Sequence, residues 1–228
     1  MGFRHQRVVT LAVTLTALAA SLCSLSGVAA ADDKVVLGGG AGIVVEGSYC
    51  TLTTIGHDHA GELVGFTAGH CGGPGAPVVA EGANNGPVGT VAAVGDGTDY
   101  GVIKFDPAKV SPTASFAGFA INGVGPDPDR GALCKQGAAT GNFCGHIHSL
   151  PGGGTRISMT GLFQPGDDGG PVTSDGLLIG LVYGGLNVPG DLQGNPPFYF
   201  THLLKFSRVV DDVNAKGGPG AGFAPLSA

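Results

Sequence analysis

The chain of 228 residues has 17 acidic and 11 basic side chains, and its formal net charge is −6. This acidic balance excludes the basic surface with which proteins bind nucleic acid or an anionic membrane. Hydrophobic residues make up 43% of the chain, and many of its 44 glycines separate short runs of Val, Ile, Leu and Phe. The composition therefore predicts a β-rich protein with many turns rather than a disordered chain.

The N-terminal segment has the features of a secretory signal peptide. A basic start is followed by an apolar stretch at residues 8–25, and small residues precede Asp32. A membrane anchor is the alternative, but Thr and Ser interrupt the stretch and no basic stop follows it. We therefore expect residues 1–31 to be removed, leaving a secreted domain of residues 32–228 with no membrane attachment. Retention at the cell wall stays open.

The cysteines predict disulfides rather than metal ligands. Of the 5 cysteines, Cys23 lies in the expected signal peptide, and the remaining four are an even number in an exported chain. Four cysteines allow three pairings, and the number alone does not distinguish them. The four are Cys50, Cys71, Cys134 and Cys144.

Short apolar runs bounded by Gly and Pro predict the strands of the first half. Residues 49–55 and 63–67 should form a hairpin. Its polar loop contains His57 and His59, which we interpret as solvated rather than metal-binding. With residues around Val44, later strands would close a first barrel of about six strands. These later strands are expected at 77–80, 89–94 and 100–105.

The second half is expected to follow a crossing rich in Pro, Ser and Gly, at residues 106–131. On its first hairpin, His146 and His148 alternate onto one face and are interpreted as surface residues. Apolar residues from Leu203 to Val213 recur at helical spacing, which predicts an amphipathic C-terminal helix. The strands expected in this half lie at 134–147, 156–159, 176–185 and 197–201.

Three segments carry the residues of a hydrolytic site in a fixed order. His70 ends the sequence F-T-A-G-H before Cys71, Asp99 lies in T-D-Y-G-V-I, and Asp168 lies in the turn G-D-D-G-G-P. These segments resemble those of the trypsin-like and chymotrypsin-like (S1-type) serine proteases. In that family, a histidine base, an aspartate that orients it and a serine nucleophile in G-D-S-G-G-P follow one another in this order. Subtilisins and α/β-hydrolases use other orders.

The resemblance implies an all-β fold of two six-stranded antiparallel β-barrels, chymotrypsin-like, with a C-terminal helix. The barrels would span about 36–110 and 131–202. The hairpin that begins at Cys134 is similar to the C-x-x-G-x-x-T-G-x-x-C-G-x-[IV] hairpin of the secreted actinobacterial subgroup. The subgroup pattern implies two local disulfides, Cys50–Cys71 and Cys134–Cys144. Val36–Gly39 resembles the start of mature proteases, with a flexible Gly-rich tail as the alternative.

Residue by residue, the resemblance implies a role for each part of the site. His70 matches the base and Asp99 the residue that orients it. The backbone N–H groups of Gly166 and Asp168 match the donors of the oxyanion hole, and Asp167 matches the buried aspartate that shapes the turn. Leu162 falls at the floor of the substrate pocket, which should then be apolar because Leu162 offers no carboxylate.

The departure from the family is Asp168, which stands where the nucleophilic serine is expected. A carboxylate has no proton for His70 to remove, and its charge should keep the imidazole protonated. We therefore expect an inactive protease homologue that binds polypeptide, as a monomer without a metal or cofactor. One alternative is an active serine endopeptidase, either with another serine as nucleophile, for which Ser158 and Ser174 are the nearest candidates, or with Asp168 as a sequence or strain variant. The other is a metal-binding module formed by His70, Asp99 and Asp168.

Overall fold

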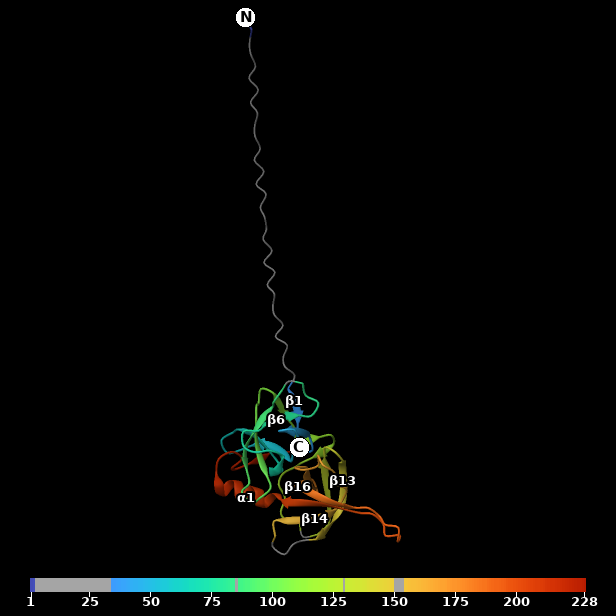
Figure 1. The fold of residues 1–228 in the computed structure, drawn as a ribbon. Helices are drawn as coiled ribbons and strands as arrows, with labels where there is room; N and C mark the ends of the chain where they lie inside the picture. Colours follow the sequence, from blue (N-terminus) through green and yellow to red (C-terminus); the bar gives the residue numbers. More distant parts are fainter. Residues whose placement is uncertain (3–33, 85, 129, 150–153) are drawn as a thin grey trace. The chain divides into compact units, whose positions relative to one another are not determined.

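The computed structural model describes residues 1–2, 34–84, 86–128, 130–149 and 154–228 (Figure 1). The expected signal peptide and its cleavage site lie outside these residues, apart from the first two positions. From Lys34 onward, the described residues belong to one compact unit. Within the described part of the chain, no helix is both long enough and apolar enough to span a membrane.

The first half is a curled, antiparallel eight-stranded sheet with the order β18-β4-β5-β8-β7-β6-β2-β3. All five residues of its interior strand β5 are buried. The strands are β2 (Gly42–Val45), β3 (Ser48–Thr51), β4 (Thr54–His57), β5 (Leu63–Thr67), β6 (Pro77–Ala80), β7 (Gly89–Val94), β8 (Gly101–Phe105) and β18 (Ala224–Pro225).

The C-terminal part of the chain closes over this sheet. Phe66 of β5 meets Phe206 and Phe223 in edge-to-face contacts, with ring centroids 5.2 and 4.9 Å apart. Strand β18 pairs with β4 at Gly56, where an added Cβ would lie 2.1 Å from the carbonyl oxygen of Ala224. Glycine at this position therefore lets the last strand approach closely enough to pair.

The second half is a closed barrel with the strand order β12-β13-β14-β17-β16-β15. Together with the curled first sheet and one C-terminal helix, it confirms the predicted chymotrypsin-like fold class. The first half has eight strands instead of the expected six, because the run expected at 49–55 forms two strands, β3 and β4, and because β18 joins the sheet. The barrel strands are β12 (Ala132–Gly137), β13 (Gly141–Ser149), β14 (Arg156–Thr160), β15 (Pro171–Ser174), β16 (Leu177–Val188) and β17 (Phe198–Lys205).

Short elements join the halves. The expected crossing contains β9 (Val110–Pro112), β10 (Ser115–Phe116) and β11 (Phe119–Ala120), and β9 pairs in parallel with β1 (Val35–Leu37). The start motif predicted at Val36 therefore lies partly in a paired strand rather than in a flexible tail. The helix α1 spans Phe206–Lys216, later than its apolar spacing suggested, because Leu203 belongs to β17.

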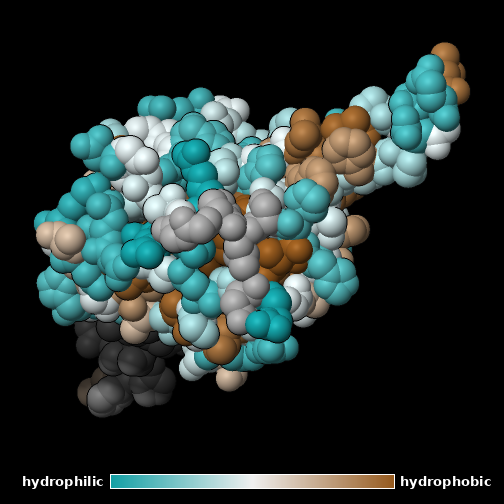
Figure 2. Space-filling view, turned by 90° about the horizontal axis from the view of Figure 1, so that it is seen from below, coloured by the Kyte–Doolittle hydropathy of each residue, from teal (hydrophilic) through white to brown (hydrophobic). Residues whose placement is uncertain are grey.

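Strands β16 and β17 continue beyond the barrel as a projecting arm, residues 186–200 (Figure 1). Figure 2 shows hydrophobic side chains at the tip of this arm and around its base. Its exposed hydrophobic residues are Leu186, Leu192, Phe198 and Tyr199.

Both disulfides expected from the family resemblance are present, Cys50–Cys71 and Cys134–Cys144. The first joins β3 to the short helix η1 (Gly69–Cys71), and the second joins the paired strands β12 and β13. Structural disulfides form and persist in oxidising compartments, so both are consistent with an extracellular protein.

Removing either disulfide should destabilise the fold by about 2–4 kcal/mol, because each restricts the unfolded chain. The Cys50–Cys71 bond should matter more, since it closes a separation of 21 residues against 10 for Cys134–Cys144. Denaturant unfolding of the two double Cys→Ala variants measures both losses. A larger loss for Cys134–Cys144 would contradict the loop-length argument.

Candidate functional site

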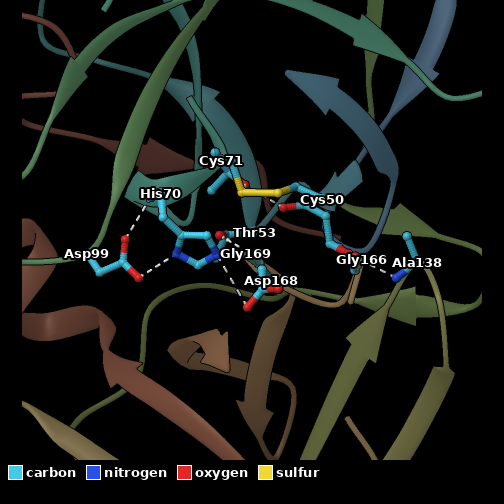
Figure 3. Close-up of a disulfide and its surroundings, with 11 residues drawn as sticks. Cys50, Thr53, His70, Cys71, Asp99, Ala138, Gly166, Asp168 and Gly169 are labelled. Atoms are coloured by element: carbon cyan, nitrogen blue, oxygen red, sulfur yellow. Dashed lines mark hydrogen bonds and ion pairs between the residues drawn. A yellow bond between two sulfur atoms is a disulfide. The ribbon is translucent and has the colours of Figure 1, made fainter. Parts of the chain in front are cut away.

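His70 lies between two carboxylates at the junction of the two halves (Figure 3). Its ring Nδ1 is 2.7 Å from Oδ2 of Asp99, whose Oδ1 accepts the His70 backbone N–H at 2.8 Å. On the other side of the ring, Nε2 is 3.6 Å from Oδ1 of Asp168, an ion-pair distance rather than a hydrogen bond. The structure therefore brings together the three residues that the motifs singled out.

Local packing positions the first of these carboxylates. Gly69 leaves room for Asp99, because an added Cβ would lie only 3.0 Å from Asp99 Oδ1. The hydroxyl of Tyr100, the residue after Asp99, donates to Asp212 of helix α1 at 2.6 Å. The C-terminal helix thus fixes the segment that presents Asp99 to His70.

The two carboxylates raise the pKa of His70 to about 10. Asp168 makes the largest contribution and Asp99 the next largest, and partial burial of the ring lowers the pKa by less than the two carboxylates raise it. Burial disfavours the charge of Asp99, but the hydrogen bonds from His70 and Gly69 lower its pKa overall. At neutral pH the ring is consequently an imidazolium. In that state it has no lone pair with which to accept a proton.

The turn that carries Asp168 is built around Asp167, which is completely buried. Its carboxylate accepts hydrogen bonds from the backbone N–H of Thr140 at 3.0 Å and from the hydroxyl of Thr140 at 2.7 Å. It also accepts the backbone N–H of Gln164 at 3.1 Å. These bonds fix the entry to the turn and satisfy a charge that would otherwise be costly to bury.

The cation that pairs with Asp167 is Lys135 of β12, whose side chain is also 0% exposed. Its Nζ lies 3.0 Å from Asp167 Oδ2 and donates to the Thr140 hydroxyl at 2.6 Å. Lys135 is not among the residues that the sequence motifs single out. A signal was present, because strand alternation places Lys135 on the same inward face as the buried Leu133.

Threonines of the first half hold the same turn from the other side. Thr51 donates its hydroxyl to the carbonyl of Gly166 at 2.6 Å and its backbone N–H to the carbonyl of Asp168 at 2.8 Å. Thr53 donates to the carbonyl of Gly169 at 2.5 Å. Because Thr51 follows Cys50, the Cys50–Cys71 disulfide connects this support directly to the His70 segment (Figure 3).

Two amide groups of the turn remain available. Gly166 has φ +105°, in the region that favours glycine, and within the described residues neither its N–H nor that of Asp168 has an acceptor. Gly169 has φ +86°, and an added Cβ would lie 2.2 Å from the carbonyl oxygen of Thr51. The glycines thus keep the turn tight while two donors stay unpaired.

Other residues considered from sequence lie in different environments. The hydroxyl of Ser158 is 2.8 Å from Nδ1 of His202, while Ser174 lies at the end of β15. Among the described residues, the His70 ring is paired with Asp99 and Asp168 and with neither serine. Leu162 is half-buried, and the neighbouring Phe163 packs against the core of the second barrel.

The other histidines of the described residues do not assemble a metal centre. No group of three or more His, Cys, Asp or Glu residues that could hold a metal ion occurs in the part of the chain that is described. His57, His146 and His148 are exposed, whereas Nδ1 of His59 lies 2.7 Å from the carbonyl oxygen of Ala221. His59 therefore contacts the C-terminal tail rather than forming a site with His57.

Solved bacterial serine proteases share this architecture. The Nocardiopsis protease NAPase aligns with a TM-score of 0.62 and 22% identity, over 79% of this chain and 97% of its own. The chymotrypsin of Cellulomonas bogoriensis aligns with a TM-score of 0.59 and 25% identity, over 85% of this chain and all of its own (100%). The protein thus has the fold of the chymotrypsin-like serine proteases.

A relative found by sequence similarity identifies the family more closely. The uncharacterized protein Rv1815 of Mycobacterium tuberculosis (strain ATCC 25618 / H37Rv) is 30% identical over 177 residues, which cover 71% of this chain and 76% of Rv1815. The chain belongs to the same family as Rv1815. No family model matches it.

The pKa of His70 should be measurable by an NMR titration and lie near 10. Asp168→Asn should lower it, because the substitution removes the larger of the two contributions. A histidine that titrates near the ordinary value of about 6.5 in the wild-type protein would contradict the ion pair.

The same pairing predicts how stability depends on pH. The folded-state pKa of His70 exceeds the unfolded value, so its contribution is complete below pH ~6.5 and is lost as the pH rises through about 10. The difference in unfolding free energy between the wild type and Asp168→Asn should therefore shrink across this range. Denaturant unfolding at several pH values measures it, and a difference that grows with pH would refute the prediction.

Breaking the buried ion pair should be far more damaging than breaking an exposed one. Lys135→Met leaves the Asp167 charge unpaired and should cost about 3–5 kcal/mol. Lys104→Met is the control, because the Lys104–Glu62 pair is about half exposed and should contribute at most about 1 kcal/mol. Urea unfolding measures both, and equal losses would show that the buried pair does not organise the turn.

Proposed function

We propose that this protein is an exported homologue of the chymotrypsin-like serine proteases that binds polypeptide without cleaving it, because Asp168 replaces the nucleophilic serine. The observation that carries the proposal is the position of the Asp168 carboxylate, 3.6 Å from His70 Nε2 in the turn after Asp167. In an active site of this class, a serine hydroxyl at this point gives its proton to a neutral imidazole. Here the first group is an anion and the second is a cation.

The chemistry of the pair argues against peptide hydrolysis. A carboxylate that attacked an amide would have to form an anhydride, which is a better acylating agent than the amide, so the equilibrium opposes the step. The imidazolium cannot act as a base while it is paired with Asp168. The negative charge next to the turn also opposes the charge that develops on an oxyanion.

Several features support retained binding of polypeptide. The N–H groups of Gly166 and Asp168 are available as donors to a carbonyl oxygen, and the His70 side chain is 48% exposed. Export directed by an N-terminal signal peptide, residues 1–31, is consistent with the two disulfides. In its simplest form, the proposal is a monomer without a cofactor. Leu162 would border the bound segment.

Restoring the nucleophile tests the proposal. Asp168→Ser should make the protein react with a fluorophosphonate probe, because a serine hydroxyl is smaller than the carboxylate and the surrounding turn need not move. Loss of the serine costs subtilisin on the order of 10⁶ in turnover, so even a partial recovery should be visible above an unreactive wild type. Labelling is measured by intact-protein mass spectrometry.

The control is Asp168→Ser combined with His70→Ala, which removes the base and should abolish the labelling. If the wild-type protein labels as well as the Asp168→Ser variant, the inactive assignment is wrong. If the folded single variant does not label, the proposed correspondence with a protease site fails.

A further inference from the structure

One edge of strand β16 is open directly beside Asp168. Strand β15 pairs with β16 only as far as Leu181. In the turn, Gly169 donates its N–H to the Val182 carbonyl at 2.7 Å, and Val182 donates its N–H to the Gly170 carbonyl at 2.8 Å. Beyond Val182, among the described residues, β16 pairs with β17 alone. The unpaired edge over residues 183–188 therefore begins next to the turn and can accept an extended segment by backbone pairing.

Phe163, in the chain leading into the turn, packs against this part of β16. An added Cβ on Gly185 would lie only 2.3 Å from the Phe163 Cβ and 2.4 Å from its Cγ. The side chain of Phe163 therefore lies directly against the Gly185 backbone, with its inner part packed on the core of the second barrel.

Hydrogen bonds fix the segment that carries Phe163. Asn187 of β16 donates its side-chain amide to the Phe163 carbonyl at 2.5 Å. Thr201 of β17 donates to the carbonyls of Gly161 and Leu162 at 3.1 and 3.4 Å. Both neighbouring strands therefore hold the backbone of residues 161–163, which keeps Phe163 beside Gly185.

We propose that Phe163 makes the site selective for a polypeptide with glycine, or at most alanine, at the residue nearest Asp168. The inference rests on the proposed binding of polypeptide at this site. A segment that pairs with the edge of β16 directs the side chain of that residue toward the gap between residues 161–163 and Gly185. The side chain of Phe163 already lies against Gly185 there, so a larger side chain clashes whereas a bare backbone fits.

The Asp168→Ser variant allows this selectivity to be measured with covalent probes. Three phosphonate probes are compared on the full chain. The first is an alkyl fluorophosphonate with no amino-acid side chain. The other two are diphenyl phosphonates of the same tripeptide, one ending in a glycine analogue and the other in a phenylalanine analogue. We expect the glycine probe to label at least about tenfold faster than the phenylalanine probe, the lower range of discrimination by a shaped apolar pocket.

Opening the gap should remove this preference. In the Asp168→Ser background, Phe163→Ala should raise the phenylalanine-to-glycine rate ratio at least about tenfold. Phe116→Ala is the matched control, because Phe116 is also a partly buried phenylalanine but lies on β10 against Gly38, in the first half of the chain. It should leave the ratio unchanged. If Phe163→Ala does not fold, Phe163→Val should shift the ratio in the same direction.

The outcomes separate the two proposals. If the alkyl fluorophosphonate labels Asp168→Ser and the glycine and phenylalanine probes then react equally, the selectivity is wrong while the proposed function stands. If a folded Phe163 variant has an unchanged phenylalanine-to-glycine rate ratio, the proposed selectivity is likewise wrong while the proposed function stands. If the alkyl probe itself does not react, the proposed function fails and the selectivity fails with it.

Discussion

The buried pair of Lys135 and Asp167 is the interaction on which the site depends. Two charges with no exposed surface are tolerated only because each is paired and further hydrogen-bonded, here through Thr140 and Gln164. The pair fixes the Asp167 side chain, and Asp167 in turn fixes the path of the backbone through Gly166, Asp168 and Gly169. The ion pair itself lies within the second half, but the turn it shapes meets Thr51 and Thr53 of the first half. The relative position of His70 and Asp168 therefore follows from a contact that involves neither residue.

Much of this arrangement was predictable from the sequence because it is encoded locally. The segments around His70, Asp99 and Asp168 have distinctive residues at fixed spacing, and the strand pattern with its glycines indicated the fold. Lys135 was missed because the hairpin pattern assigns no role to that position, although its alternation with Leu133 marked an inward-facing charge. The role of Phe163 depends on contact with Gly185, which is 22 positions further on (185 − 163 = 22). No local pattern reports such a contact.

The last strand shows the same limit. Ala224–Pro225 is too short to have a periodicity, and its place beside β4 depends on the missing side chain of Gly56 and on Phe223 packing against Phe66. Likewise, helical spacing placed Leu203 in the helix, whereas its backbone pairs in β17. Inward-facing residues are apolar in strands and helices alike, so the apolar pattern alone did not locate the boundary between β17 and α1.

An intact turn is not in itself a sign of function, because the contacts that shape it also join the two halves of the fold. Gly169, Asp167 and Thr51 would be retained for packing alone. The N–H groups of Gly166 and Asp168 differ in this respect, since within the described part of the chain neither has an acceptor, and packing does not require two such donors. The exposed side chain of His70 likewise contributes little to the core. These features, rather than the shape of the turn, support the proposal that the site receives a polypeptide carbonyl.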